Sequence, residues 1–387
     1  MKRVNNLYNK ICDIKIIMEM YDKAIKLNTK NKKKIQKFEN FYSCNIAKIK
    51  EILMKKDYKP GKYNIFLIRE PKMRIIMSQE IEDKIINHLV AKYFLIEVFD
   101  KTLSDRNCAT RIGKGTHYAL KIFKKDYNDF LNKYEKFYIL KLDISKYFYN
   151  LDHSIIKKLV EHKIKDKNVL KIVNSIIDST DEDYINQEII KLKNNERKKI
   201  KKSNYLDKDI RIQEIERLPL YEKGKGVCIG NMVSQIVATF YLDELDRYIQ
   251  EDLGIKAFCR YMDDFYCMHQ DKQYLKECLK KVEKILDKYK LKLNNKTKIY
   301  SSNENIEFLG FMFSSKNHNI RMKLTNKTKK KFKVKMKFQN KELLNNNIDF
   351  AQYIQVRNSY RGHLRYGNCS MLYKKYVVLR DNLELSN

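Results

Sequence analysis

The sequence contains no tryptophan, although it has 27 tyrosines and 18 phenylalanines. Tyrosine must therefore supply much of the aromatic packing that tryptophan would otherwise provide. The sequence also has no uninterrupted apolar run of the length that crosses a bilayer, which predicts no membrane contact. Charged residues break the apolar part of the basic stretch 1–23, so we expect neither a signal peptide nor a membrane anchor. At 387 residues and 43% hydrophobic content, the chain is long enough for a large core or for two to three domains.

Paired cysteines are missing as well. None of the eight cysteines forms a C-x-x-C pair or stands near a histidine at zinc-finger spacing. This pattern argues against a zinc finger and indicates the scattered, reduced cysteines of a cytoplasmic protein. The eight are Cys12, Cys44, Cys108, Cys228, Cys259, Cys267, Cys278 and Cys369.

Positive charge, in contrast, is abundant. The 81 lysines and arginines outnumber the 48 aspartates and glutamates, which gives a formal net charge of +33 spread over nearly the whole length. Such a charge favours nucleic acid as the partner, because cationic side chains neutralise phosphates. The many tyrosine rings are available for stacking on bases. The alternative is a lysine-rich composition without a binding role.

The stretch Phe258–Gln270, FCRYMDDFYCMHQ, organises the rest of the chain. It consists of two β-prone runs joined by an acidic junction, Asp263–Asp264, which predicts a hairpin. Two neighbouring carboxylates repel each other and are a poor choice for a simple turn. A divalent cation with a preference for hard oxygen ligands, such as Mg²⁺, would remove this repulsion.

A third carboxylate follows a strand-like run more than a hundred residues earlier. Residues 137–142 are apolar enough for a buried strand, and Asp143 stands at its end. A buried carboxylate is costly unless it meets a cation, so Asp143 is a candidate metal ligand. Asp152, by contrast, has an ordinary explanation as the N-cap of the helix that follows it.

Two basic turns precede this strand. Arg69, Lys72 and Arg74 surround Pro71 between two strand-like runs in 62–77, and arginine offers a forked donor suited to phosphate. Further on, Gly113 and Gly115 flank Lys114 just after Arg111. Small residues let backbone amides approach an anion, although the order is not that of a Walker loop.

A glycine-rich turn leads into an amphipathic helix within 224–249. Gly224, Gly226 and Gly230 allow close backbone approach. Ser234 and Gln235 fall near the start of the helix, where polar side chains either cap it or face a ligand. The stretch 180–217 before it is polar, highly charged and short of a clear apolar face, which indicates a partly helical insertion.

The remaining elements are expected from periodicity and composition. Residues 1–60 are expected to form helices joined by a basic link at 30–34, residues 271–290 an amphipathic helix, and residues 308–313 a single strand. From residue 323 on we expect basic helices, with residues 359–368 as a linker between the last two. This makes the fold class α+β.

Together these features predict a site for nucleotidyl transfer in a basic groove. Three carboxylates that converge can hold two Mg²⁺ ions about 4 Å apart. One ion would activate a 3′-hydroxyl and the other would stabilise the leaving pyrophosphate. The alternative is a basic RNA-binding scaffold with an inactive site, against which the presence of all three carboxylates argues.

The motifs that carry these residues resemble those of reverse transcriptases. LDISKYF around Asp143, IGNMVSQ at 229–235, YMDD at 261–264 and FLGF at 308–311 occur in the order and spacing of that family, over roughly residues 62–313. The resemblance implies a right-hand polymerase that uses Mg²⁺ (Mn²⁺ as a substitute), dNTPs, an RNA template and an RNA–DNA hybrid. It implies a palm built on an antiparallel sheet backed by helices, and a helical thumb.

The resemblance also implies roles for individual residues. Asp143 and Asp263 are the main metal ligands, with Asp264 beside them, and the ring of Phe148 crowds a 2′-hydroxyl and so favours dNTPs. The incoming triphosphate contacts Arg69, Lys72, Arg74, Arg111 and Gln235. The template–primer contacts Gly230, Asn231, Ser234 and Gly310. Lys296 or Lys298 is the candidate that protonates pyrophosphate.

The implied domains are an N-terminal helical extension at 1–61, fingers at 62–135, a palm at 136–318 with the insertion at 180–217, and a basic thumb at 319–387. IGNMVSQ is most similar to diversity-generating retroelement enzymes of bacteria or phages, and retron and antiphage-defence reverse transcriptases share this layout. A dedicated structured RNA and an accessory protein are the expected partners. Nothing after the thumb resembles an integrase, an RNase H or a zinc-bearing endonuclease.

Overall fold

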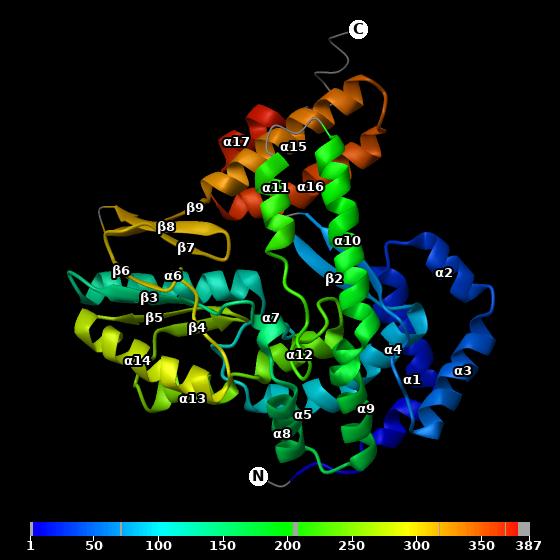
Figure 1. The fold of residues 1–387 in the computed structure, drawn as a ribbon. Helices are drawn as coiled ribbons and strands as arrows, with labels where there is room; N and C mark the ends of the chain where they lie inside the picture. Colours follow the sequence, from blue (N-terminus) through cyan, green and yellow to red (C-terminus); the bar gives the residue numbers. More distant parts are fainter. Residues whose placement is uncertain (1–2, 70–71, 204–207, 317, 368, 378–387) are drawn as a thin grey trace. The chain divides into compact units, whose positions relative to one another are not determined.

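The computed structural model describes residues 3–69, 72–203, 208–316, 318–367 and 369–377. The chain divides into two compact units, each assembled from segments far apart in the sequence. The first contains residues 1–115, 143–254 and 280–294, and the second contains residues 116–142, 255–279 and 295–387. The structure is a mixture of helices and antiparallel sheets, as expected for an α+β protein (Figure 1).

The first unit begins with the expected helices. Met20, Ile25, Ile49 and Leu53 are buried and lie at helical spacing, while Ile16, Ala24 and Ile52 are half-buried. The basic stretch at 30–34 is not a link throughout, because a helix starts at Lys32, where the Asn31 side chain caps it by accepting from the Lys34 amide. The elements are η1 (Tyr8–Cys12), α1 (Ile14–Met20), the π-helix η2 (Tyr21–Lys26), α2 (Lys32–Glu39) and α3 (Tyr42–Lys55).

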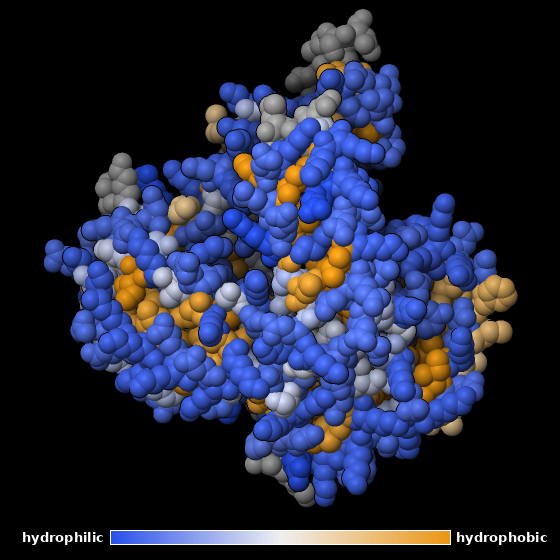
Figure 2. All heavy atoms as spheres, in the orientation of Figure 1, coloured by the Kyte–Doolittle hydropathy of each residue, from blue (hydrophilic) through white to orange (hydrophobic). Residues whose placement is uncertain are grey.

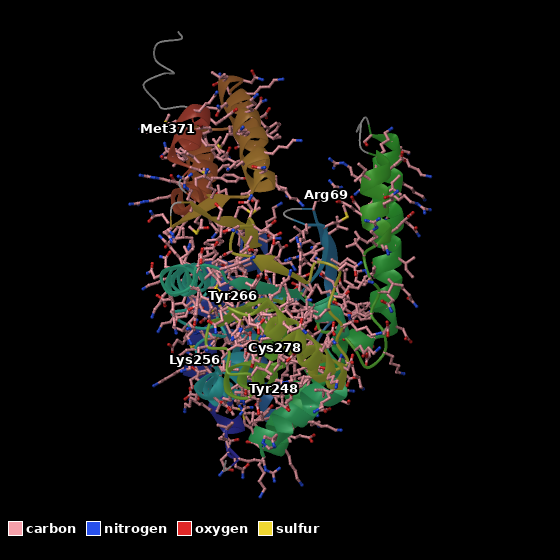
Figure 3. The ribbon with its side chains drawn as sticks, turned by 90° about the vertical axis from the view of Figure 1, so that its left-hand side faces the viewer. Arg69, Tyr248, Lys256, Tyr266, Cys278 and Met371 are labelled. Carbon is pink, nitrogen blue, oxygen red and sulfur yellow. The ribbon has the colours of Figure 1, made fainter. Side chains whose placement is uncertain are left out.

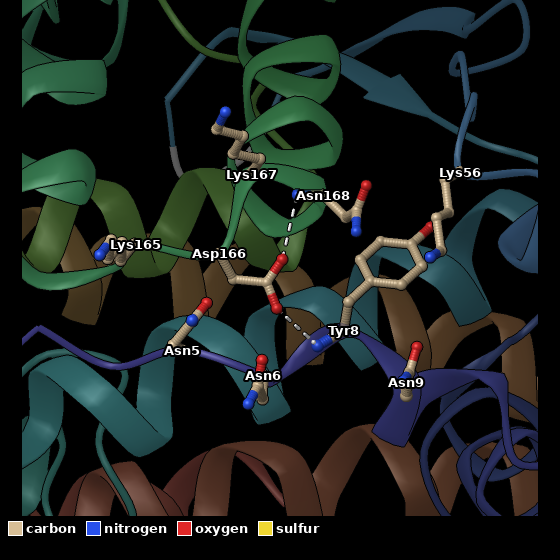
Figure 4. Close-up of a pocket in the computed structure, with 9 residues that line it drawn as sticks. All are labelled: Asn5, Asn6, Tyr8, Asn9, Lys56, Lys165, Asp166, Lys167 and Asn168. Atoms are coloured by element: carbon tan, nitrogen blue, oxygen red, sulfur yellow. Dashed lines mark hydrogen bonds between the residues drawn. The ribbon is translucent and has the colours of Figure 1, made fainter.

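A polar pocket of about 350 Å³ lies where the N-terminal segment meets α9 (Lys167–Asp178). Asp166 caps α9 and also accepts hydrogen bonds from the amides of Leu7 and Tyr8, at 2.9 and 3.1 Å (Figure 4). Val4 forms a short parallel bridge with Ile164 beside it. The acidic group of this pocket is therefore used to fasten the start of the chain to α9.

The predicted strands in 62–77 form an antiparallel hairpin, β1 (Asn64–Ile68) with β2 (Arg74–Ser78). The helices that follow are α4 (Ile81–Val90), the π-helix η3 (Ala91–Ile96), α5 (Glu97–Phe99) and η4 (Asp100–Thr102). Ile81, Ile85, Leu89 and Phe94 are all buried, as expected for one apolar helix face.

The charged stretch at 180–217 has a buried apolar face, contrary to the sequence-based expectation. After η5 (Ser179–Asp181) it forms a long helix, α10 (Asp183–Lys202), and a shorter one, α11 (Lys208–Glu216). Ile185 and Ile189 of α10 belong to one core cluster with Ile75 and Met77 of β2. A few isoleucines among many charged residues are enough to form this buried face, because the β1–β2 hairpin supplies the apolar side chains that they contact.

The two neighbouring isoleucines of α10 provide a direct test of this packing. Ile189 is fully buried, whereas Ile190 is 46% exposed. We expect Ile189→Ala to lower the free energy of unfolding by about 2–5 kcal/mol, because it leaves a cavity. Ile190→Ala should change it by less than about 0.5 kcal/mol. Denaturant titration of the two variants measures the difference, and equal effects would mean that α10 does not pack on the hairpin.

The glycine-rich turn leads into two helices rather than one. These are α12 (Met232–Phe240) and α13 (Asp243–Glu251), separated at Tyr241–Leu242. Ile236, Phe240 and Leu245 of these helices are buried. The other helices of this unit are α7 (Tyr147–Asn150) and α8 (His153–Lys163), and Asp152 caps α8 as expected, by accepting from the amide of Ile155.

The second unit is built on a four-stranded sheet with the order β4-β5-β3-β6. Figure 1 shows α6 (Thr116–Lys133) and the start of α14 (Lys272–Lys288) on opposite sides of this sheet. The ring of Tyr266 on β5, labelled in Figure 3, packs edge-on against Phe123 of α6 with centroids 4.7 Å apart. The strands are β3 (Tyr138–Asp143), β4 (Phe258–Tyr261), β5 (Asp264–His269) and β6 (Lys298–Ser301).

The run at 308–313 is a turn between two strands, not one strand. β7 (Ile306–Phe308) and β8 (Phe311–Lys316) pair as a hairpin, and β9 (Asn319–Leu324) continues the sheet. The two turn residues, Leu309 and Gly310, both have positive φ, at 48° and 82°. A two-residue turn of this kind needs left-handed backbone at both positions, which Gly310 adopts without steric cost.

The C-terminal part is helical and basic, as expected. Its helices are α15 (Asn326–Leu344), α16 (Phe350–Tyr366) and α17 (Ser370–Tyr376). The predicted linker at 359–368 is helical as far as Tyr366, where α16 ends, and Asn368 lies outside the described residues. The face of the protein drawn in Figure 2 is mostly hydrophilic. Within the described ranges, no helix combines the length and the apolar composition that crossing a membrane requires.

Candidate active site

The hairpin formed by β4 and β5 fixes the two neighbouring aspartates. Tyr261 pairs with Asp264, so the turn consists of Met262 and Asp263, and Asp264 is already the first residue of β5. Met262 adopts a left-handed backbone with φ of 59°. Most side chains of the two strands are buried, and Phe258 pairs with Cys267 at the other end of the hairpin. Asp263 is therefore held at the tip of the hairpin, and the turn lies one residue earlier than the expected junction Asp263–Asp264.

Asp264 has a cationic partner on the neighbouring strand. The Lys141 ammonium on β3 makes an ion pair with its carboxylate and lies 5.1 Å from the centroid of the Phe308 ring. The Lys141 side chain is only 12% exposed. This contact places the C-terminal part of β3 beside the start of β5. Lys141 and Asp143 stand two residues apart and so share one face of their strand. This spacing is the sequence signal that could have indicated a role for Lys141.

Asp143 is the last residue of β3, as the sequence predicted. The backbone just beyond the strand is fixed by a segment of the first unit. The amide of Asn294 donates to the carbonyl of Asp143, and the amide of Ser145 donates to the carbonyl of Lys292, both at 2.9 Å. The three predicted ligands thus belong to different segments, with Asp143 in the first unit and the hairpin pair in the second.

The cations at the β1–β2 hairpin differ in their surroundings. Ile68 pairs with Arg74, and Lys72 and Arg74 are exposed. Arg69, which is labelled in Figure 3, follows the last residue of β1 and forms an ion pair with Glu196 of α10. Pro71, around which these residues were expected to cluster, lies outside the described residues.

Glu196 is the anchor that holds Arg69. Burial opposes ionisation of Glu196, but hydrogen bonds from Lys199 and Arg69 outweigh that effect and lower the pKa of the carboxyl below its usual value. Arg69 therefore meets a charged carboxylate on α10, which fastens the end of β1 to that helix.

The structure gives Arg111 a local role that the sequence did not reveal. Its guanidinium binds the side chain and carbonyl of Asp100 and donates to the carbonyls of Ser104 and Asn107. The side chain is 7% exposed. Contact with a triphosphate would require these bonds to break, so the geometry assigns Arg111 to fastening the loop before α6. No sequence pattern identifies such a role, because the acceptors are mostly backbone carbonyls.

Phe148 lies on α7, half-buried, and its carbonyl accepts the amide of Val227 at 2.8 Å. This bond ties Phe148 to the turn that leads into α12, on which Gln235 is also half-buried. The two predicted nucleotide contacts therefore come from segments that are joined within the first unit.

The other residues of the IGNMVSQ stretch hold this turn in place. The Asn231 amide donates to the hydroxyl of Tyr63 at 3.1 Å, and Ser234 is buried. A Cβ on Gly230 would lie 2.8 Å from the carbonyl oxygen of Met77, and its φ is 133°. Glycine is thus needed here for the close approach of β2.

The candidates in the second unit include Gly310, Lys296 and Lys298. Gly310 occupies the β7–β8 turn already described. Lys298 begins β6, where it is 57% exposed and forms an ion pair with Glu304 at 3.1 Å. Lys296 stands two residues before β6.

An acidic residue at the tip of a hairpin, and another at the end of a strand in the same helix-backed sheet, are features of the palm of a nucleotidyl-transferring polymerase. The comparison with known families agrees. Residues 53–313, about two thirds of the chain, match the model of the family described as reverse transcriptase (RNA-dependent DNA polymerase), and the chain belongs to this family. No match was found among curated proteins.

Membership of the family settles the general activity. The chain is an RNA-directed DNA polymerase, a nucleotidyltransferase whose substrates are an RNA template and deoxynucleoside triphosphates. Enzymes of this family use divalent metal ions. The matched range also agrees with the extent of the resemblance read from the motifs.

Proposed function

We propose that the protein copies a dedicated structured RNA into cDNA by two-metal nucleotidyl transfer, with Asp143 and Asp263 as the main ligands of two Mg²⁺ ions and Asp264 beside them. The observation that carries the proposal is the order β5-β3 in the sheet, with Lys141 of β3 paired to Asp264 of β5. Asp143 follows Lys141 by two residues on the same strand face, and Asp263 directly precedes Asp264 at the tip of the β4–β5 hairpin.

The donor set fits hard divalent cations. Carboxylate oxygens are the ligands that Mg²⁺ prefers, and Asp264 already attracts an ammonium group in the structure. When bound, the ions would activate the primer 3′-hydroxyl and stabilise the charge on the leaving pyrophosphate. Asp143 and Asp263 hold the ions, while Lys141 limits the charge repulsion around Asp264.

Other residues of the chain bind and orient the nucleotide. Exposed Lys72 and Arg74 and the tethered Arg69 would neutralise the triphosphate, and the ring of Phe148, with Gln235, would border the sugar. Arg111 is left out of this set because its donors are engaged in the loop. Gly230 and Gly310 would lie along the template–primer, and Lys296 or Lys298 would donate a proton to pyrophosphate.

We assign the parts of the chain as the sequence suggested. The hairpin β1–β2 belongs to the fingers, the four-stranded sheet to the palm, and the basic helices α15–α17 to the thumb. The lysine-rich helix α15 supports the last assignment, because it offers many cations to a nucleic-acid backbone. A diversity-generating-type retroelement is the setting we propose, with a retron or an antiphage-defence system as the alternative.

Primer extension tests the proposal. Purified protein with a primed RNA template, dNTPs and Mg²⁺ should lengthen the primer, and a chelator should stop the reaction. RNA binding with no synthesis on any template would instead support the alternative of a non-catalytic scaffold. Sequencing of the RNA and nascent cDNA that co-purify with the protein would identify the template. A heterogeneous RNA population would contradict a dedicated template.

A further inference from the structure

A buried histidine in the first unit points an unsatisfied nitrogen at two carboxylates. His153, the first residue of α8, has a side chain that is 4% exposed. Its Nδ1 lies 3.3 Å from an oxygen of Asp178 at the end of α9 and 3.5 Å from an oxygen of Asp181 in η5. Among the described residues, Nδ1 has no hydrogen-bond partner.

The other ring nitrogen fixes the protonation pattern of the ring. Nε2 lies 2.7 Å from the carbonyl oxygen of Gly226. A carbonyl only accepts, so Nε2 must carry the hydrogen, and Nδ1 of the neutral ring then presents a lone pair. Metal-binding histidines are commonly oriented in this way, with the outer N–H donated to a carbonyl. A lone pair facing two carboxylate oxygens is repulsive unless a cation lies between them.

The distances distinguish a metal ion from a protonated ring. A charged N–H···O⁻ hydrogen bond is usually about 2.7–2.9 Å long. Two ligand atoms that are each about 2.0–2.1 Å from a tetrahedral Zn²⁺ are instead roughly 3.3 Å apart. The contacts of Nδ1 with the two carboxylate oxygens, at 3.3 and 3.5 Å, match the second geometry.

The carboxylates are held by their second oxygens, which leaves the first ones for the ion. The other oxygen of Asp178 pairs with Lys157 at 2.7 Å, and that of Asp181 accepts the amide of Gly224 at 2.8 Å. Asp178 and Asp181 are 43% and 22% exposed, so an ion and a water ligand can enter. One imidazole with two carboxylates favours a first-row cation such as Zn²⁺ over Mg²⁺.

We infer that His153, Asp178 and Asp181 form a second divalent-cation site, distinct from the candidate active site. Its role is structural. Gly226 also accepts a hydrogen bond from the Thr180 hydroxyl at 2.8 Å, and Gly224 accepts the amide of His153 at 2.9 Å. A bound ion therefore joins α8 and the end of α9 to the 224–226 turn that leads into α12.

Measuring the binding of Zn²⁺ in the presence of excess Mg²⁺ tests the site. Metal-free wild-type protein should bind one Zn²⁺ and unfold at a higher temperature when it is bound. His153→Gln keeps an N–H for the Gly226 carbonyl but removes the ligand, and Asp181→Asn keeps the acceptor for Gly224. Because even second-shell changes cost 10–100-fold in metal affinity, each variant should bind Zn²⁺ more than about 100-fold more weakly.

Two controls make the outcome decisive. His162→Gln changes an exposed histidine of the same helix and should leave Zn²⁺ binding unchanged. Asp263→Asn should also retain it, which separates this site from the candidate active site and makes the result independent of polymerase activity. No Zn²⁺ binding by wild-type protein, or equal affinity in His153→Gln, would overturn the inference.

Discussion

Asp263→Asn should reduce primer extension by about 10³-fold or more. The substitution keeps the size of the side chain and its place at the tip of the β4–β5 hairpin but removes the charge that would hold a divalent cation. Metal ions contribute several kcal/mol to transition-state stabilisation, and each 1.36 kcal/mol is a factor of ten in rate. Single-turnover extension on a primed RNA template measures the loss, and we expect the same result for Asp143→Asn.

The neighbouring aspartate and a surface aspartate serve as controls. Asp264→Asn should cost less than Asp263→Asn, because Lys141 already balances part of the charge of Asp264. Asp252→Asn changes an exposed residue just after α13 and should leave the rate unaltered. RNA binding should persist in every variant. Near-normal extension by Asp263→Asn would refute the assignment of the metal ligands.

Phe148→Ala should weaken the preference for dNTPs over NTPs by about 10- to 200-fold, the range that a steric pocket typically supplies. A large ring at this position would clash with a 2′-hydroxyl, and alanine removes the clash. The backbone should remain in place, because the carbonyl of residue 148 still accepts the amide of Val227, and the neighbouring Tyr147 stays buried.

The measurement compares kcat/KM for a matched dNTP and NTP on the same primed template. Phe41→Ala, which changes a phenylalanine that is 65% exposed, is the control and should leave the ratio unchanged. An unaltered ratio in Phe148→Ala would mean that another residue contacts the sugar. Loss of all synthesis would be separated from a change of preference by measuring thermal stability in parallel.

The sequence predicted the elements that carry the three aspartates, because the signals there are local. Asp143 ends an apolar run, and YMDD interrupts two others, so strand and hairpin follow from alternation and burial alone. The turn was misplaced by one residue, since pairing between strands decides which positions lie in the turn. The same reason explains why 308–313 is a hairpin turn rather than one strand.

The sequence predicted less well where the surroundings of a residue depend on segments far away in the sequence. The few isoleucines of α10 did not indicate an apolar face until the β1–β2 hairpin was seen to cover them. The sequence also did not predict that Arg111, proposed there as a phosphate contact, donates to backbone carbonyls of the preceding loop. The ion pair between Lys141 and Asp264 and the approach of His153 to Asp178 and Asp181 were not predicted either.

The sequence by itself determined the chemistry of this protein. The motifs resemble those of reverse transcriptases in residue type and order, and the match of residues 53–313 to the family model shows the family without any coordinates. Only the tertiary structure decided how individual polar side chains are used, as with Arg69 held by Glu196 or Nδ1 of His153 left facing two carboxylates. The physical reason is that residue type fixes what a group can bind, whereas burial and geometry fix which partners it meets.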